Sequence, residues 1–419
     1  MAIVLAALVG GLLVLILLNL EYPAKSIDRE VGHRYAVADP EFARAMGTLL
    51  GPALLAGNHV TALCNGEEIF PAMLGAIAGA RRSITFETYI YWSGEIGQAF
   101  GDALSERARA GVAVHVVVDW VGSGKMDQRI ISQMMDAGVE VVKYHPLRWY
   151  ALRRLNNRTH RKLLVVDGRV GFTGGVGIAD NWQGHAQDPD HWRDSHFMLE
   201  GPAVAEMQSA FMDNWIETRG VVLHGDDYFP PLEPAGPQLA QVFKSSVDEA
   251  AESVRLMYLM SIASAAESVR IANAYFVPDD LSVRTLVAAA RRGVTVEIIV
   301  PGRHTDALVV GKASRRCWGA LLEAGVSIYE YEPTMFHVKV MVVDGRWTSV
   351  GSTNFDSRSF RLNDEANLNI LDATFAGGQV RVFEEDKARS RRVTRDVWRR
   401  RPLSERLAER MAGVLRPQL

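Results

Sequence analysis

One polar pattern occurs twice in this chain, and both copies lead into an apolar run. The first copy lies in "THRKLLVVDG" (159–168) and the second, 177 residues later, in "FHVKVMVVDG" (336–345). Each copy holds a histidine, a lysine and an aspartate at the same spacing: His160, Lys162 and Asp167, then His337, Lys339 and Asp344. Because side chains alternate along a strand, the histidine and lysine of each copy point to the same side. Two such pairs predict one site to which each copy contributes half.

The chain around the two copies is also duplicated. Short β-rich runs alternate with helical patterns from about residue 58, and the order recurs after about residue 235. "ARAGVAVHVVVD" aligns with "ARRGVTVEIIVP" at an offset of 182 residues, and "MMDAGVEVVKYH" aligns with "LLEAGVSIYEYE" at an offset of 187. Three landmarks in the same order at similar offsets indicate an internal duplication.

This pattern predicts an α/β fold of two pseudo-repeated sandwich halves, each a mixed sheet flanked by helices. We place the halves at 58–228 and 239–400, with the proline-rich stretch "DDYFPPLEPAGPQ" between them and a basic C-terminal tail at 401–419. The segment 389–413 has a helical pattern, which fits either an interfacial membrane helix or an ordinary packing helix.

The N-terminal segment differs from the rest of the chain. Ala2–Leu20 carries no charge, and at this length a helix crosses the ~30 Å hydrocarbon core. A cleaved signal peptide is the alternative, but the start has no basic side chain and no convincing cleavage site follows. We therefore predict a transmembrane anchor at 1–20 and a juxtamembrane segment at 21–57. Basic residues follow the span, which predicts that the globular part lies in the cytoplasm: Lys25, Arg29 and Arg34.

Composition excludes several classes of protein. A formal net charge of −3 argues against a generally basic nucleic-acid binder. The two cysteines, Cys64 and Cys317, are too few for a disulfide framework, and neither lies near residues at zinc-ligand spacing. We expect no metal and no cofactor.

Two imidazoles and two ammonium groups suit a phosphodiester substrate. The lysines and backbone N–H groups hold the charge that grows on the phosphoryl oxygens without a metal. One neutral imidazole attacks phosphorus, and the other, when protonated, gives its proton to the departing alkoxide. Histidine fits both tasks because its ordinary pKa lies near neutrality.

At this point the sequence resembles the phospholipase D superfamily, whose HxKxxxxD motif matches "HRKLLVVD" and "HVKVMVVD". The resemblance runs from about residue 60 to 400, and its nearest branch is the bacterial cardiolipin synthases. It rests further on "FETYIYWSGEIG" (86–97), "WRDSHFMLEGPAV" (192–204), "NAYFVPDDL" (273–281) and "GSTNFDSRS" (351–359). Both sandwich halves are accordingly expected to be phospholipase D-like.

The resemblance implies roles for these residues. His160 becomes the nucleophile and His337 the acid and base, Lys162 and Lys339 bind phosphate, and Asp167 and Asp344 fix turns. Glu365 is expected to orient His337 and Asp194 to orient His160, with Asp180 and Asp188 as alternatives to Asp194. The phosphate pocket is expected to include Ser352, Asn354 and Gly175. Gly177 departs from the family pattern, which has asparagine there, as Asn354 does in the second half.

The run "RWYALRRLNNRTHRK" (148–162) is strongly basic and contains two aromatic residues. It fits either a solvated loop or a surface that meets anionic lipid headgroups. Its positive charge is also expected to lower the pKa of His160.

The function that the resemblance implies is a membrane-bound phosphatidyl transferase. It would make cardiolipin from phosphatidylglycerol and a second phospholipid alcohol, at the bacterial inner membrane, through a phosphatidyl-histidine. A hydrolytic phospholipase D, or another phosphodiesterase of the superfamily, is the alternative. A nuclease is disfavoured by the near-neutral charge and the anchor, and intact histidines and lysines in both copies argue against a non-catalytic scaffold.

Overall fold

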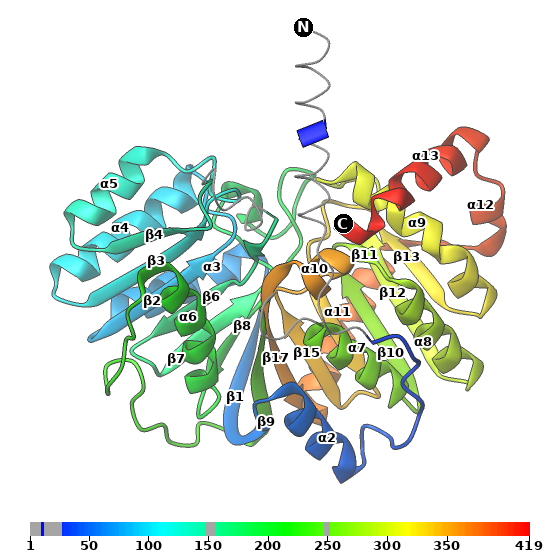
Figure 1. Cartoon of the computed structure of the whole chain (residues 1–419), viewed down its shortest axis with the longest axis horizontal. Coiled ribbons are helices and arrows are strands. Elements are labelled where there is room, and N and C mark those ends of the chain that lie inside the picture. Colours follow the sequence, from blue (N-terminus) through cyan, green and yellow to red (C-terminus); the bar gives the residue numbers. More distant parts are fainter. Residues whose placement is uncertain (1–9, 12–26, 148–155, 247–251) are drawn as a thin grey trace, which may run out of the picture.

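The computed structural model describes residues 10–11, 27–147, 156–246 and 252–419 (Figure 1). The predicted anchor and residues 148–155 of the basic run lie outside these ranges, apart from residues 10–11. Among the described residues no helix has the length and apolar character needed to span a bilayer. The anchor therefore stays a prediction.

A single mixed sheet of 16 strands extends through both halves. The two halves repeat one strand order outward from their junction, where β1 pairs antiparallel with β9. In the first half the order is β1 (Leu55–Cys64), β8 (Ser195–Glu200), β7 (Val170–Gly174), β6 (Leu163–Val166), β2 (Ser83–Thr88), β3 (Ala113–Asp119) and β4 (Glu140–Tyr144). In the second half it is β9 (Gln238–Ser245), β17 (Asn363–Leu371), β15 (Trp347–Gly351), β14 (Lys339–Val343), β10 (Ser268–Asn273), β12 (Thr295–Pro301) and β13 (Ser327–Tyr331). The predicted duplication is confirmed.

Helices cover both faces of this sheet. In the first half they are α3 (Asn65–Gly79), α4 (Glu95–Arg109), α5 (Gln128–Asp136) and α6 (Val204–Arg219). The second half repeats them as α7 (Ser253–Ala263), α8 (Asp280–Arg291), α9 (Leu308–Glu323) and α11 (Ala373–Ala388). Because both faces are covered, β2 is buried along its whole length, including its polar residues Thr85 and Glu87.

The two halves share one hydrophobic core. A cluster of buried side chains joins α6 and α11 with strands from both halves, and Phe197 of β8 meets Phe375 of α11 with ring centroids 6.2 Å apart. Two further large clusters lie under other helices, one mainly in each half, and a small third cluster joins Val277, Ala313 and Ala412. The shared cluster fixes how the two copies of the motif face each other.

Part of the expected juxtamembrane segment belongs to the second half. Helix α2 (Pro40–Leu50) buries Phe42 and Met46 in the core cluster of that half. The Phe42 ring packs edge-on against Trp347, with centroids 5.0 Å apart. The chain then continues into β1 at the junction.

The start of the C-terminal segment differs from its predicted helical form. Ser390–Val393 is a strand, β18, which pairs antiparallel with β13 at the edge of the sheet. The physical reason is that β13 would otherwise leave a row of N–H and C=O groups unpaired. Helix α12 (Arg395–Arg399) and helix α13 (Leu403–Val414) follow.

Both motif aspartates fix turns, as expected. The Asp167 carboxylate accepts hydrogen bonds from the backbone N–H groups of residues 81–83, and Asp344 accepts from those of residues 266–268. Both aspartates lie in the left-handed region, at φ 53° and 50°. Each carboxylate thus ties a hairpin of the motif to the start of the central strand beside it.

We expect Asp344→Ala to lower the free energy of unfolding by about 2 kcal/mol, because three N–H groups lose a charged acceptor and alanine is strained at positive φ. Urea titration followed by tryptophan fluorescence measures this, with exposed Asp226→Ala as the control. Folded Asp344→Ala should keep its turnover rate. A loss of turnover without a loss of stability would place Asp344 in the chemistry.

Candidate active site

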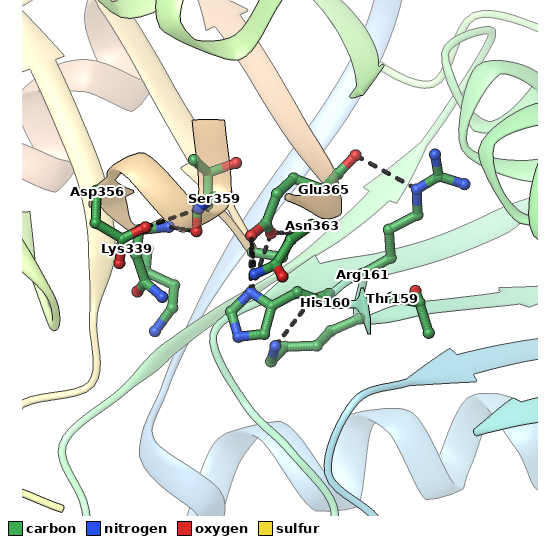
Figure 2. A network of polar contacts seen from close by, with 12 residues as sticks. Thr159, His160, Arg161, Lys339, Asp356, Ser359, Asn363 and Glu365 are labelled. Atoms are coloured by element: carbon green, nitrogen blue, oxygen red, sulfur yellow. Dashed lines mark hydrogen bonds and ion pairs between the residues drawn. The ribbon is translucent and has the colours of Figure 1, made fainter. Parts of the chain in front are cut away.

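The first motif histidine reaches across to the other half. His160 follows the short strand β5 (Arg158–Thr159), which runs parallel to the first residues of β17. Its backbone N–H donates to the carbonyl of Asp364 at 2.9 Å. Its ring Nδ1 lies 3.0 Å from both carboxylate oxygens of Glu365, and Figure 2 shows that carboxylate directly against the ring.

The second motif histidine does the same in the opposite direction. Phe336 forms a parallel bridge with Arg193, and the backbone N–H of His337 donates to the Arg193 carbonyl at 2.8 Å. The ring Nδ1 of His337 lies 2.8 Å from Oδ2 of Asp194. The two arrangements are related by the pseudo-symmetry of the halves.

The predicted pairing of histidines with carboxylates is therefore wrong, although the four residues are right. Glu365 holds His160 and Asp194 holds His337, so each carboxylate serves the histidine of the other half. The reason is that β8 and β17 flank the junction of the halves, and the residues at their starts face the opposite motif. The alternatives lie elsewhere: Asp180 accepts from the first turn of α4, and Asp188 accepts from His191.

Each carboxylate is fixed by further hydrogen bonds. Ser352 Oγ donates to Glu365 at 2.5 Å. Trp182 Nε1 donates to Asp194 at 2.9 Å. Gly175 leaves room for Asp194, because a Cβ there would stand 2.2 Å from Oδ1. Ser352 and Gly175 occupy equivalent places in the two halves, so both predicted positions support a carboxylate.

The two motif lysines are buried and close to the histidines. Lys339 Nζ lies 3.2 Å from Nε2 of His337, and Lys162 Nζ donates to the carbonyl of His160 at 2.9 Å. Burial, and then the charge of Lys339, lowers the pKa of Lys162 to about 7. Burial also lowers the pKa of Lys339 to about 8 against the pull of Asp194 and Glu365. The electrostatic influence of one lysine on the other shows that both halves contribute cations to one site.

Both imidazoles favour the neutral form. Burial lowers the pKa of His160 to about 4, with Glu365 opposing the shift and Lys162 adding to it. Burial and then Lys339 lower the pKa of His337, and Asp194 opposes them. The predicted direction for His160 is confirmed, but the main cause is burial and not the basic run.

Both carboxylates stay ionised despite burial. Burial alone would raise their pKa values, but the adjacent histidine and lysine outweigh it, so the pKa of Glu365 and that of Asp194 are lowered. A neutral imidazole that donates Nδ1–H to such a carboxylate directs the lone pair of Nε2 away from it. This arrangement prepares Nε2 for a nucleophilic or proton-transfer step.

Asn354 and Gly177 make the site asymmetric. Asn354 is buried, and its amide oxygen has no hydrogen-bond partner among the described residues. A Cβ on Gly177 would lie 2.8 Å from Cβ of Ile90 and 3.2 Å from the ring of Trp182. An asparagine therefore does not fit at 177 without moving these neighbours, and only the second half presents an amide.

The described part of the basic run is structural. Arg161 is fully buried, and its guanidinium donates to carbonyls of Ala210 and Ser245 and to the carboxylate of Asp213. Figure 2 shows its further hydrogen bond to Glu365. Arg158 is also buried, with a guanidinium nitrogen 3.6 Å from Asp119. For these two arginines the expectation of a lipid-facing surface is wrong.

Sequence reasoning missed two residues beside the site. Arg193 forms a bidentate ion pair with Asp386 of α11, at 2.9 Å for both contacts, and so holds the backbone that receives His337. His196 is buried, neither of its ring nitrogens has a hydrogen-bond partner among the described residues, and burial lowers its pKa to about 4. Both lie in "WRDSH", where the signal was a run of polar residues leading into a buried strand.

The metal prediction has no direct test. Across the described ranges, His, Cys, Asp and Glu side chains form no group of three that could hold a metal ion.

The duplicated sheet and the two carboxylate-bound histidines define an enzyme of the phospholipase D superfamily. The sequence family described as "Cardiolipin synthase, PLD-like domain" matches residues 73–215 and 258–387, more than half of the chain. The chain belongs to this family, and hence to the phosphatidyltransferases as a class of enzyme.

Similar proteins agree with this assignment. A cardiolipin synthase of Geobacillus kaustophilus (strain HTA426) is 37% identical over 365 residues, which cover 86% of this chain and 72% of that protein. Cardiolipin synthase 2 of Bacillus cereus (strain ATCC 14579) is 35% identical over 360 residues, covering 85% of this chain and 70% of that protein. The crystal structure of phosphatidylserine synthase from Haemophilus influenzae Rd KW20 superposes with a TM-score of 0.66 at 14% identity, over 90% of this chain and all of that one. At this identity the structural match shows the fold alone.

The crossed pairs predict a specific pattern of coupling. In a double-mutant cycle on the free energy of unfolding, His160→Ala should couple to Glu365→Gln by about 0.5–3 kcal/mol, since the two side chains are in contact. The cycle of His160→Ala with Asp194→Asn should be additive within about 0.5 kcal/mol. Urea unfolding measures both cycles. Coupling of His160 to Asp194 and not to Glu365 would instead indicate that each carboxylate holds the histidine of its own half.

Proposed function

We propose that this enzyme joins two phospholipids into cardiolipin, with phosphatidylglycerol as donor and a second phospholipid alcohol as acceptor. The observation that carries the proposal is the pair of buried imidazoles, each held by a carboxylate of the opposite half, beside Lys162 and Lys339. The names of the curated relatives support the lipid substrate class.

In the first step Nε2 of His160 attacks phosphorus while the lysines hold the non-bridging oxygens. The new N–P bond replaces the P–O bond to glycerol, and protonated His337 gives its proton to the departing alkoxide. The side-chain NH2 of Asn354 would donate a further hydrogen bond to a phosphoryl oxygen.

In the second step His337, now neutral, takes the proton of the acceptor hydroxyl. The hydroxyl oxygen attacks phosphorus, the N–P bond breaks, and His160 and protonated His337 are restored. The carboxylates of Glu365 and Asp194 keep both rings in one orientation throughout.

One feature supports His160 as the attacking group: its pKa is lowered to about 4, so the ring is neutral at physiological pH. The pKa of His337 is also lowered, by burial and Lys339, and Asp194 opposes that shift. In the proposed mechanism the negative charge of the bound phosphodiester supports Asp194 in holding the proton on His337.

The burial of the site supports transfer over hydrolysis. His160 and His337 are 8% and 4% exposed, and both lysines are 3% exposed. A site with so little access to water favours a bound alcohol as acceptor. We further propose that Ala2–Leu20 anchors the enzyme in the bacterial inner membrane by a single pass, with the catalytic part on the cytoplasmic side.

Product analysis tests the reaction. The full chain, incubated with phosphatidylglycerol vesicles in EDTA, should release glycerol and cardiolipin in equal amounts by lipid mass spectrometry. Phosphatidic acid as the main product would instead indicate a hydrolase. Loss of activity in EDTA that a divalent ion restores would overturn the metal-free mechanism.

An activated donor separates the roles of the two histidines. A phosphatidyl nitrophenyl ester needs little protonation of its leaving group, so His337→Ala should still release nitrophenol in a single burst and keep the adduct. His160→Ala should form no adduct. Peptide mapping should locate the phosphoryl group on His160; finding it on another residue would reverse the assignment.

The lysine pKa values predict an alkaline limit. Because the ammonium forms bind the phosphoryl oxygens, kcat/KM should fall as pH rises through about 7 to 8, where Lys162 and Lys339 of the free enzyme lose their protons. Lys162→Arg keeps its charge in this range and should shift the alkaline decline of kcat/KM to higher pH, whereas exposed Lys143→Arg should not. If Lys162→Arg leaves the decline at the same pH, another group is responsible for it.

A further inference from the structure

An apolar surface on the second half has no partner within the described chain. It comprises Leu308 and Val309 of α9 and, on or directly after α13, Leu403, Leu407, Met411, Val414 and Leu415. These side chains are between 47% and 77% exposed. We name this surface the α9–α13 face. A contiguous exposed apolar patch of this kind marks a contact with a protein or a membrane.

Helix α13 is oriented with its apolar side outward. Leu403, Leu407 and Met411 recur every four residues and form one stripe along the helix. The opposite side is fixed to the protein, since Glu409 is buried in an ion pair with Arg401 and Ala412 is buried against α9. A helix that served only to pack would turn its apolar stripe inward.

The surface next to this stripe is positively charged. Residues 399–416 contain six arginines against two glutamates, and one of the glutamates is the buried Glu409. Arg406 and Arg410 are exposed next to the apolar stripe, and Arg316 is exposed on the adjacent α9. An apolar stripe with arginines beside it complements the interface of an anionic bilayer, where hydrocarbon lies below acidic headgroups.

The α9–α13 face also adjoins the active site. It contains an open groove of about 630 Å³, lined in part by Leu308 and Lys312. The same two residues line a cavity of about 140 Å³ that Tyr275 also lines. The Tyr275 ring stands 6.3 Å from the ring of His337, centroid to centroid. Figure 1 shows α9 and α13 packed together on one side of the second half.

We propose that the α9–α13 face docks on the surface of an anionic bilayer and holds the Tyr275 cavity against the lipid. The proposal deepens the proposed function, on which its catalytic consequence rests. Two other occupants fit less well. A second copy related by a two-fold axis would bring the same arginines together. The N-terminal run Ala2–Leu20 carries no negative charge to meet them.

A fluorescent reporter tests docking without reference to catalysis. The full chain carrying Leu407→Cys or Met411→Cys is labelled with an environment-sensitive dye and reconstituted into vesicles of phosphatidylglycerol and phosphatidylcholine with brominated acyl chains. The matched control is Val222→Cys, an exposed apolar site in the first half, and the unsubstituted chain reports labelling of Cys64. Bromine should quench the labels at 407 and 411 and leave the label at 222 unchanged.

The role of the exposed arginines beside the α9–α13 face is tested in the same assay. Arg406→Gln with Arg410→Gln should reduce the ratio of docked to undocked label about 30-fold, since each basic residue near an anionic surface contributes a factor of about five. Vesicles of phosphatidylcholine alone should give a similar loss when both arginines are retained. If quenching stays the same after the arginine substitutions and without phosphatidylglycerol, charge has no role in docking.

The catalytic consequence has its own measurement. Leu407→Gln with Met411→Gln should lower the rate on vesicle phosphatidylglycerol and leave the rate on a soluble short-chain phosphatidylglycerol unchanged, with Val221→Gln and Val222→Gln as the control. If the unsubstituted enzyme does not act on the soluble lipid, the proposed function fails, while the quenching result still decides docking.

The remaining outcomes overturn the proposal and identify the occupant. Energy transfer between labelled copies without lipid would assign the face to a second copy. A label shielded from aqueous iodide equally in detergent and in vesicles, with no quenching by bromine, would assign it to the N-terminal run. If iodide quenches the label equally in every condition, nothing covers the α9–α13 face and the proposal is wrong.

Discussion

The structure depends on two carboxylates that each belong to one half and hold the histidine of the other. Glu365 and Asp194 are fully buried and stay ionised, which is costly unless each has a partner. Neither half contains that partner, so a half alone would bury an uncompensated charge. The shared core, the β1–β9 junction and the Arg193–Asp386 pair all serve to keep the halves in this register.

The local elements and the motif residues could be predicted because their signals are contiguous. The runs that form α4, β3, α5 and β4 each carry their own periodicity, and their second copies confirm the reading. Such periodicity needs no knowledge of which segments meet in space. The turn role of Asp167 and Asp344 came instead from the family resemblance, since the N–H groups that these carboxylates bind lie 76 to 86 residues earlier in the chain.

The pairing within the site could not be predicted, because it is a long-range property. His160 and Glu365 are 205 residues apart, and Asp194 and His337 are 143 apart. Chain proximity favours pairing within a half, and only the junction of the sheets decides otherwise. The burial of Arg158 and Arg161 could not be predicted for the same reason. A basic run indicates a solvated surface unless the distant carbonyls and carboxylates that accept its hydrogen bonds are known.

The differences between the two halves matter as much as their symmetry. The proposed transfer between two alcohols uses one imidazole that attacks and one that carries a proton, so it needs different surroundings for the two rings. Here a glutamate with Ser352 holds one ring, and an aspartate that fits only beside Gly175 holds the other. Gly177 removes from the first half the amide that Asn354 supplies in the second. These differences between the halves leave the backbone symmetric and give the two histidines unequal surroundings. The proposed roles of nucleophile and acid require that inequality.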